Sequence, residues 1–427
     1  MEVQIISKEC IKPCSSTPSH LKTFNISLLD QFLSPIFYCI ALFYPNSISQ
    51  SSLLLKHSLS KTLTQFYPLA GKIKDHLSID CNDEGALYIE AKSNIPLSSY
   101  LTQPDLTLLP KLVPDLSPFL ENPTGAFLLR IQQTTFTCGA LALGLSVSHM
   151  ALDGTAFASF IKAWALTASS SAKQLTNPNL DAPITFPQRD SFPKEAVFSA
   201  LWSPYLKKGK VIATRLMFVA SALDKLKADA ASSTVEKPSR VEVVSAVICK
   251  SVMAAFNAPI SIIHLVNVRG KATPPFPDCS LGNFVWLAPV TFREKDGEVS
   301  NFVGKIRNAV RKIDSDFVKK IGCLKVFEEV KVIESEVSEG KEVMLFTSWL
   351  NFGVYKNSDF GWGNPIWIAP CNRIDSEEIE FNNVCILNDT KIGNGVEAWV
   401  YLPQDVAVVV EKDAQLLQYA SINPTPL

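Results

Sequence analysis

Positive charge is not concentrated anywhere in this sequence of 427 residues. The formal net charge is −1, and charged residues make up only 19% of the chain. Phosphate contacts to DNA or RNA need clustered lysine and arginine, and no such runs occur, so nucleic-acid binding is not expected. A balanced charge also provides no field that would hold the whole protein on an anionic membrane.

Paired cysteines and long apolar runs are also missing. The ten cysteines are scattered without any C-x-x-C spacing, and a chain of this length needs no disulfide staples, so we expect reduced thiols. The longest apolar run, Pro35 to Pro45, is too short to cross a bilayer. Residues Met1 to Gln4 lack the basic start of a secretory signal, and no apolar core follows them. We therefore expect a cytoplasmic protein without a membrane anchor.

The composition is typical of a protein with large folded cores. Hydrophobic residues make up 47% of the chain, and its length predicts two domains. Between Ser169 and Pro193 the chain is rich in serine, asparagine and proline, and such a stretch cannot continue a helix or a central strand. We interpret residues 171–195 as a crossover linker between domains that span residues 1–170 and 196–427.

Both predicted domains combine helices with strands. In the first, apolar residues at helical spacing end before Pro68, and alternating runs follow near residues 86–91 and 127–147. In the second, Ser239 and Glu242 have the spacing of a capping box that opens a helix. Strands are expected near residues 260–268, 384–387 and 396–402, one terminal helix over residues 406–417, and a surface loop at residues 335–341. The two domains have similar content and no regular βαβ alternation.

The stretch from His149 to Gly154 is the most informative in the chain. Alternating apolar residues before it indicate a strand, and apolar residues at helical spacing after it indicate a helix. A histidine between a strand and a helix is rigidly held and well placed to act as a general base. Asp153 could cap the following helix or orient the imidazole, and the spacing alone does not decide between these two roles.

Other chemistries for His149 lack the residues that they need. A zinc site usually needs a second histidine, and none of the others lies four residues away. A serine nucleophile would need a G-x-S-x-G elbow, which is missing. A base that acts on a hydroxyl or amine, and a purely structural histidine, both stay open. His264 lies in an apolar run, where we expect a hydrogen-bonded core histidine.

A second unusual string comprises Asp359, Phe360, Gly361, Trp362 and Gly363. Two glycines around a large ring favour a turn with positive φ and an anchored side chain. The first three letters occur in protein kinases, but the Gly-rich loop and the H-R-D string of a kinase are absent. Taken alone, the string is best interpreted as a buried structural loop.

Together, H-x-x-x-D-G at residues 149–154 and D-F-G-W-G at residues 359–363 resemble the BAHD family of plant acyl-CoA-dependent acyltransferases. Further matching segments follow in the same order as in the family: Tyr67–Lys72, Asn267-x-Arg269, Gly282-Asn283, Thr347–Trp349 and Gly395–Ala398. The resemblance covers essentially the whole chain. Ser27–Gln31 and Cys81–Asp83 are similar to the vinorine synthase-like branch of alkaloid acetyltransferases.

The resemblance implies an α/β fold with two similar chloramphenicol acetyltransferase-like domains, in which helices flank mixed sheets and a solvent channel lies between the domains. It places His149 in that channel as the general base. Asp153 is implied to face away from the substrate, to pair with Arg269 and to hold the active-site loop. Thr347 and Trp349 are implied to lie near the reacting carbonyl group.

The resemblance also suggests roles outside the channel. Lys237 and Ser239 match a segment that contacts CoA. Residues 359–363 are implied to act structurally, at a distance from the histidine. A segment near residues 362–385 is expected to pack with the N-terminal domain.

The implied reaction is transfer of an acyl group, expected to be acetyl, from CoA to a hydroxyl of a specialised metabolite such as an alkaloid. Neutral His149 would take the proton as the acceptor oxygen attacks the thioester. The Trp349 indole N–H or the Thr347 hydroxyl would bind the oxyanion. A thiol with a pKa of roughly 8.5 is a good leaving group, so we expect a ternary complex, without acyl-enzyme, metal or permanently bound cofactor.

The sequence leaves several alternative functions open. The donor could be malonyl-, benzoyl- or hydroxycinnamoyl-CoA, or the acceptor an amine. A catalytically silent relative would bind a small molecule or a partner protein, and a metal hydrolase would need three ligands near His149. The expected partners are acyl-CoA and a small alcohol, with no nucleic acid and no membrane, and the expected state is a monomer.

Overall fold

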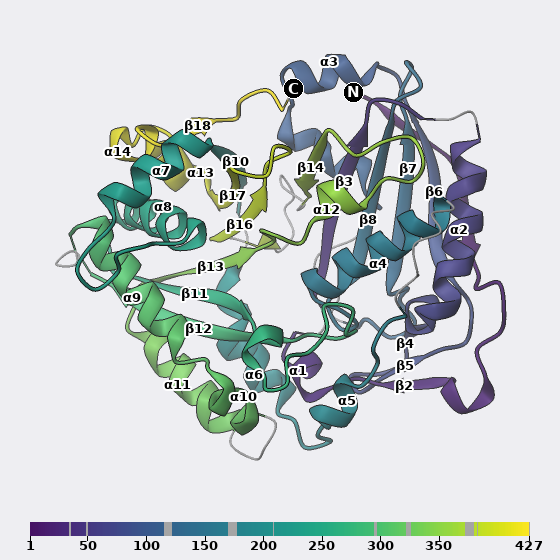
Figure 1. The fold of residues 1–427 in the computed structure, drawn as a ribbon, viewed down its shortest axis with the longest axis horizontal. Coiled ribbons are helices and arrows are strands. Elements are labelled where there is room, and N and C mark those ends of the chain that lie inside the picture. Colours follow the sequence, from purple (N-terminus) through teal and green to yellow (C-terminus); the bar gives the residue numbers. More distant parts are fainter. Residues whose placement is uncertain are drawn as a thin grey trace.

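Two sheets, each covered by helices, lie side by side in the computed structural model (Figure 1). It describes residues 1–33, 36–47, 50–114, 122–169, 177–207, 209–293, 297–321, 326–371, 380–381 and 383–426. The predicted domain boundary at residue 170 and the first part of the linker, residues 171–176, lie outside the described residues. So do residues 372–379 and 382 of the segment expected to pack with the N-terminal domain.

The first sheet has six strands in the order β1-β6-β7-β8-β3-β14. These strands are β1 (Val3–Ile11), β3 (Phe37–Tyr44), β6 (Ala86–Ser93), β7 (Leu129–Thr135), β8 (Leu141–Ser148) and β14 (Trp367–Pro370). The β6–β7 pair is parallel and the other pairs are antiparallel. β14 comes from late in the chain and pairs with β3, with Trp367 opposite Phe43. One sheet therefore joins segments that the sequence assigned to two domains.

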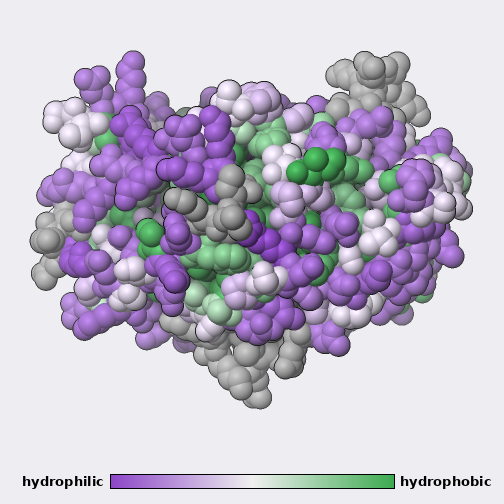
Figure 2. All heavy atoms as spheres, turned by 90° about the horizontal axis from the view of Figure 1, so that it is seen from below, coloured by the Kyte–Doolittle hydropathy of each residue, from purple (hydrophilic) through white to green (hydrophobic). Residues whose placement is uncertain are grey.

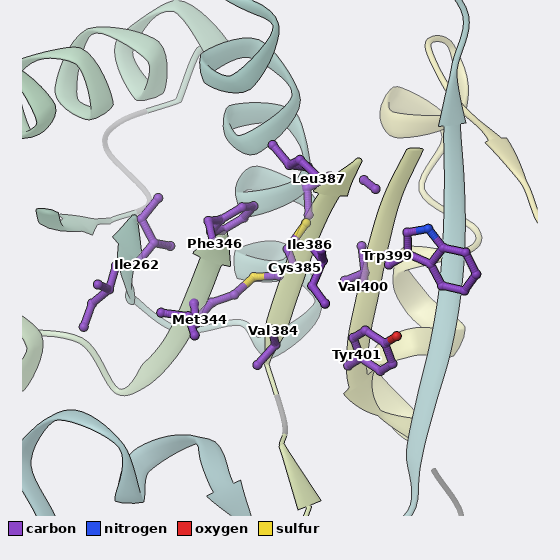
Figure 3. Packing of buried hydrophobic residues seen from close by; sticks show 14 of the residues in the cluster. Ile262, Met344, Phe346, Val384, Cys385, Ile386, Leu387, Trp399, Val400 and Tyr401 are labelled. Atoms are coloured by element: carbon purple, nitrogen blue, oxygen red, sulfur yellow. The ribbon is translucent and has the colours of Figure 1, made fainter. Parts of the chain in front are cut away.

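The second sheet has seven strands in the order β12-β11-β13-β16-β17-β10-β18. These strands are β10 (Val211–Phe218), β11 (Ile260–Asn267), β12 (Val285–Phe292), β13 (Glu342–Ser348), β16 (Val384–Asp389), β17 (Val396–Pro403) and β18 (Ser421–Ile422). The strands predicted near residues 260–268, 384–387 and 396–402 are confirmed as β11, β16 and β17. Figure 3 shows buried side chains of β13, β16 and β17 packed along this sheet.

Helices cover the two sheets, because each presents one apolar stripe to its neighbours. In α2 (Ser51–Gln65), Leu55, Leu59 and Leu63 are fully buried, as their spacing predicts. α4 (Gly154–Ala168) packs on α2, and its Trp164 indole N–H donates to the Leu55 carbonyl at 3.1 Å. α8 (Arg240–Phe256) begins with the predicted capping box of Ser239 and Glu242. α9 (Val299–Arg311) lies beside α8 and β12, and α11 (Val326–Ser338) lies beside β12 and β11.

The remaining elements are short. The helices are α1 (Leu28–Gln31), α3 (Leu97–Thr102), α5 (Ala182–Thr185), α6 (Lys194–Leu201), α7 (Ala220–Asp229), α10 (Ser315–Ile321), α12 (Val354–Asn357), α13 (Gln404–Val410) and α14 (Ala414–Leu417). The strands are β2 (Thr23–Asn25), β4 (Lys72–Ile73), β5 (Ser78–Asp80), β9 (Leu206–Lys207) and β15 (Glu380–Phe381). Among the described residues, no helix is both long enough and apolar enough to traverse a bilayer.

Two sequence predictions about local structure are wrong. The expected loop at residues 335–341 begins as the last turn of α11, because Val330, Ile333 and Val337 form a buried stripe that keeps the segment helical. The expected single terminal helix is two helices, α13 and α14. Asp413 separates them, because its carboxylate accepts backbone N–H bonds at the start of α14 and so favours a new helix start.

Candidate active site

His149 is held between a strand and a helix. β8 ends at Ser148, and the His149 backbone N–H donates to the carbonyl of Ile36 at 2.7 Å. α4 begins at Gly154, where Asp153 is the N-cap and its carboxylate accepts the Ala156 N–H at 2.9 Å. The imidazole is therefore fixed by rigid elements on both sides, as the change in hydrophobic period predicts.

The His149 side chain lines a cavity with an empty volume of about 910 Å³, part of which is open to solvent. One wall comes from the first sheet and its continuation into α4, and the other from strands β11, β12, β13 and β16 of the second sheet. Most lining side chains are apolar: Ile36, Phe37, Tyr38, Trp202, Leu265, Val285, Leu345, Trp349, Phe352, Val384 and Ile386. In Figure 2, hydrophobic residues are visible between two hydrophilic flanks of the molecule. The cavity suits a bulky molecule with little charge.

One nitrogen of the His149 ring is already occupied. Nδ1 lies 2.8 Å from the side-chain oxygen of Asn283. The Asn283 side-chain N–H₂ group donates in turn to the His149 carbonyl and, at 2.7 Å, to the carboxylate of Asp30. Nε2 is therefore the nitrogen left for a substrate. Gly282-Asn283 and Ser27–Gln31 both belong to the segments that resemble the family, but the sequence predicts no role at the histidine for either of them.

The surroundings of His149 keep its imidazole neutral. Burial lowers the pKa of His149 below its usual 6.5, because the cation loses its hydration. The Asn283 hydrogen bond and the negative charge of Asp153 act in the opposite direction and are smaller. A neutral imidazole near pH 7 can accept a proton, which is what a general base must do.

An aromatic side chain that sequence reasoning missed covers one side of the imidazole. The ring of Tyr38, on β3, lies 4.7 Å from the imidazole and 6.2 Å from the indole of Trp349. Burial raises the pKa of the Tyr38 phenol well above its usual value, so this group stays neutral. Tyr38 falls within the apolar run from Pro35 to Pro45, where a residue that lines a cavity has the same pattern as a core residue.

Asp153 is almost fully buried and forms an ion pair with Arg269. The Nη1 and Nη2 atoms of Arg269 donate to the two carboxylate oxygens at 2.6 and 3.0 Å. The backbone N–H of Phe284 also donates to the carboxylate, at 3.0 Å, and Arg269 donates to the Ser280 carbonyl at 2.9 Å. Asp153 thus caps α4 and ties it to two segments of the second half of the chain. None of these contacts involves the imidazole.

Gly154 allows the second half of the chain to approach the start of α4. A Cβ atom at this position would lie 2.6 Å from the ring of Phe352, which itself lines the cavity. Only glycine leaves room for that ring. The glycine after Asp153 therefore shapes the cavity wall.

Thr347 and Trp349 lie at the end of β13 and line the same cavity as His149. The Trp349 backbone N–H donates to the Leu387 carbonyl at 2.7 Å, which fixes this end of the strand against β16. The structure therefore brings these two polar groups, from the second sheet, to the histidine of the first.

Lys237 and Ser239 lie elsewhere, at the exposed start of α8, and neither lines the cavity. The Ser239 hydroxyl accepts the Glu242 N–H at 3.2 Å. Arg307 on α9 pairs with Glu242 at 2.6 Å and donates to the Lys237 carbonyl at 2.9 Å. The positive end of a long helix and two cationic side chains thus meet at this surface.

The string from Asp359 to Gly363 also lies outside the cavity lining. The Asp359 carboxylate accepts the backbone N–H groups of Gly361 and Gly363, each at 2.8 Å. Both glycines have positive φ, 109° and 101°. The Phe360 ring is fully buried against Trp164 of α4, with ring centroids 4.9 Å apart. These contacts anchor a turn on the outer side of α4.

His264, on β11, is buried as predicted, and its ring stacks on Phe346 with centroids 5.1 Å apart. The prediction that its polar atoms are hydrogen-bonded is wrong for Nε2, which has no partner in the described part of the chain. The aromatic neighbour provides contact area but no acceptor. Burial lowers the pKa of His264 to about 4, so the ring is neutral.

The sequence profile of the Transferase family matches residues 1–417. The chain belongs to this family of BAHD acyltransferases and is an acyltransferase. The fold class expected from the sequence, two-domain α/β with mixed sheets flanked by helices, is confirmed.

Plant O-acetyltransferases are among its relatives. The chain is 39% identical to epi-neemfruitin B 7-O-acetyltransferase of Melia azedarach and 38% identical to limonoid 7-O-acetyltransferase of Citrus sinensis, and each alignment covers 100% of both chains. It is 32% identical to stemmadenine O-acetyltransferase of Catharanthus roseus, over 96% of this chain and 97% of that one.

Two solved structures share the fold. Vinorine synthase matches with a TM-score of 0.84 and 30% identity, over 100% of both chains. The TRI101 protein of F. sporotrichioides, solved with coenzyme A and T-2, matches with a TM-score of 0.74 over 94% of this chain and 99% of that one. Its identity of 18% indicates a shared fold only.

Proposed function

We propose that this acyltransferase moves an acetyl group from acetyl-CoA to a hydroxyl of a bulky, mainly apolar plant metabolite, with His149 as the general base. The observation that carries the proposal is a neutral imidazole, with no partner on Nε2 among the described residues, in an apolar cavity between the two sheets. The O-acetyltransferase names of its full-length relatives support the acetyl group and the oxygen acceptor.

The proposed reaction needs two reactants in the cavity at once. His149 Nε2 takes the hydroxyl proton while the acceptor oxygen forms a bond to the thioester carbon. The tetrahedral oxyanion receives a hydrogen bond from the Trp349 indole or the Thr347 hydroxyl. The carbon–sulfur bond then breaks, the CoA thiolate leaves, and His149 returns the proton to sulfur. Because the thiolate is a good leaving group, the ternary complex needs no acyl-enzyme.

The start of α8 is the proposed site for the phosphates of CoA. The Lys237 ammonium group and the N-terminal end of a helix of 17 residues both favour an anion. The Ser239 hydroxyl accepts one hydrogen bond within the capping box, and its own proton remains available to a phosphate oxygen.

The cavity favours an uncharged acceptor of the limonoid kind. Asp153 is the one carboxylate among the described lining residues, and its oxygens already bind Arg269 and two backbone N–H groups. A protonated amine would therefore find no free carboxylate.

An alkaloid alcohol, the acceptor suggested by the sequence, is the second candidate. The faces of Tyr38 and Trp349, whose ring centroids lie 6.2 Å apart beside His149, could bind a cation without a carboxylate. The 32% identity to stemmadenine O-acetyltransferase supports this alternative.

Thiol release tests the proposal. The protein is incubated with acetyl-, malonyl-, benzoyl- and hydroxycinnamoyl-CoA, each with limonoid alcohols, alkaloid alcohols and amines, and free CoA thiol is measured. We expect the fastest release with acetyl-CoA and a limonoid alcohol. Labelled acetyl-CoA in a plant extract would then identify the natural product. Absence of turnover with every pair would favour the silent binding protein instead.

The other sequence predictions complete the proposal. We propose a monomer in the cytoplasm with domains at residues 1–170 and 196–427, joined by a linker at residues 171–195. A segment near residues 362–385 is proposed to pack with the N-terminal domain, which the pairing of β14 with β3 supports. Size-exclusion chromatography with light scattering tests the monomer. Limited proteolysis tests the domain limits, with cleavage expected in residues 171–195.

A further inference from the structure

The segment Ser27–Gln31 has no role in the reaction proposed above, yet its Asp30 is joined to the histidine. Ser27 and Asp30 form a capping box at the start of α1, and the Asp30 side chain is only 2% exposed. One carboxylate oxygen accepts the N–H and O–H of Ser27, at 2.7 and 2.6 Å. The other accepts the backbone and side-chain N–H groups of Asn283, both at 2.7 Å. Four donors therefore converge on this carboxylate, as expected for its ionised form.

Asp30 determines which way the Asn283 amide faces. The Asn283 N–H₂ group donates to the Asp30 carboxylate and to the His149 carbonyl, and neither of these groups can donate a hydrogen bond in return. A flipped amide would place its oxygen against the negative carboxylate. The amide oxygen must therefore face Nδ1 of His149, 2.8 Å away.

The backbone supports the same arrangement. Gly282, which precedes Asn283, has a φ of 116°, a conformation that residues with a side chain rarely adopt. This turn lets both the backbone N–H and the side chain of Asn283 point to Asp30. Two segments that are more than two hundred residues apart in the sequence therefore meet at a single carboxylate.

An amide oxygen accepts a hydrogen bond and cannot donate one. Nδ1 of a neutral His149 must therefore carry the ring proton, and the lone pair of Nε2 must be free. We propose that Asp30 is a positioning residue that acts through Asn283 to hold His149 in the Nδ1–H tautomer, with Nε2 as the basic nitrogen. The consequence for catalysis rests on the proposed function, since it requires His149 to be the base.

The charges around this chain of hydrogen bonds are consistent with the assignment. Burial raises the pKa of Asp30 to about 6, against the opposing effect of its hydrogen bonds to Ser27 and Asn283, so the carboxylate is still ionised at pH 7.5. Ser27 and Asn283, its hydrogen-bonding partners, are both uncharged. Around His149, Tyr38 is neutral and Asp153 is paired with Arg269. Asp30 is thus the carboxylate joined to the imidazole through hydrogen bonds.

The tautomer can be observed directly by nitrogen NMR. Protein labelled with ¹⁵N-histidine is compared with its Asp30→Asn variant at pH 7.5, and the five histidines are assigned by single substitutions. In the native protein we expect Nδ1 of His149 to have the shift of a protonated nitrogen and Nε2 that of an unprotonated one. In Asp30→Asn the Asn283 amide can flip, and we expect the two shifts to move toward each other or to exchange.

Kinetics on the same variants separates positioning from folding. We expect Asp30→Asn to lower kcat by about tenfold to a hundredfold, with little change in KM for acetyl-CoA. This factor corresponds to the loss of one hydrogen bond to a charged group. Glu397→Gln, the same kind of change at a buried carboxylate that pairs with Arg215 and does not line the cavity, should leave both kcat and the His149 shifts unchanged. Asp30→Ala serves as the second variant if Asp30→Asn folds poorly.

Each outcome has a definite meaning. Unchanged His149 shifts in both Asp30 variants would overturn the positioning role, whatever happens to kcat. The Nε2–H tautomer in the native protein would overturn it as well. A changed tautomer with unchanged kcat would support the role of Asp30 and would instead contradict His149 as the base, so the two proposals can fail separately.

Discussion

His149 and His264 are both neutral because burial lowers their pKa values, and each lies against an aromatic ring, yet they differ in access to a cavity and in hydrogen-bond partners. His149 lies at the end of a strand, lines a cavity and has an acceptor on Nδ1. His264 lies within a strand, stacks on Phe346 and has no partner for Nε2 among the described residues. A neutral imidazole is thus insufficient for base catalysis. The ring also needs access to a substrate and a partner that fixes its proton.

The largest expected effect follows from removing the ring at each position. His149→Ala should lower kcat by roughly 10²- to 10⁴-fold, the usual contribution of a general base, with the thermal midpoint nearly unchanged. His264→Leu should keep most of the activity. Steady-state kinetics would measure kcat of both variants, and thermal unfolding would measure their midpoints. Equal loss of activity in the two variants would remove the distinction drawn between the two histidines.

The second prediction concerns the ion pair of Asp153 and Arg269, which holds the loop that carries His149. Asp153→Ala leaves the Arg269 guanidinium buried without a carboxylate and should reduce the free energy of unfolding by about 3–5 kcal/mol. Denaturant titration measures this loss, with KM for the acceptor as a second measurement. A stable Asp153→Ala variant with a large loss in kcat alone would point to a direct part in the chemistry.

The third prediction concerns how the buried His264 makes the free energy of unfolding depend on pH. Its pKa is about 4 in the folded protein and about 6.5 when unfolded, so the unfolded chain binds more protons between these values. Stability must therefore fall as the pH drops below 6.5. His264→Leu removes this contribution and should gain about 2 kcal/mol relative to the native protein between pH 8 and pH 5.

Denaturant titrations at these two pH values would check this gain. His149 titrates in the same direction in both proteins, so its contribution cancels in the comparison. A constant difference between native and variant protein at the two pH values would show that His264 does not resist protonation.

The smallest expected effect comes from the motif that touches neither histidine. Asp359→Ala removes an exposed acceptor of two backbone N–H groups and should cost about 1 kcal/mol of stability, with kcat unchanged. Phe360→Ala, which empties a buried site beside Trp164, should cost about 3–5 kcal/mol and serves as the contrasting variant. A tenfold loss of kcat in Asp359→Ala would mean that the motif acts on the site.

Much of the local structure follows from the sequence alone, because burial imposes a period on it. Leu55, Leu59 and Leu63 predicted α2, and the pair of Ser239 and Glu242 predicted the start of α8. The prediction failed at residues 335–338, where glutamate and serine suggested a loop. Three buried apolar residues at helical spacing extend α11 through that stretch, since tertiary packing outweighs local composition.

The site was predicted only in part. The sequence marked His149 and Asp153 by their spacing and suggested Arg269 by resemblance, and the structure places Asp153 and Arg269 within 2.6 Å of each other. The sequence predicted no role for Asp30, Asn283 or Tyr38, because their contacts join strands and turns that are far apart in the chain. A sequence pattern within one segment does not predict which distant segment will pack against it.

The sequence by itself therefore determined many of the helices and strands, the histidine at a strand–helix junction and the family. Only the tertiary structure decided which side chains line the apolar cavity between the two sheets and that β14 packs on the N-terminal sheet by pairing with β3. It also decided that an amide held by a distant carboxylate faces the imidazole. The physical reason is that periodicity and capping act within one turn or strand, whereas hydrogen-bond partners and cavity walls depend on which surfaces pack together.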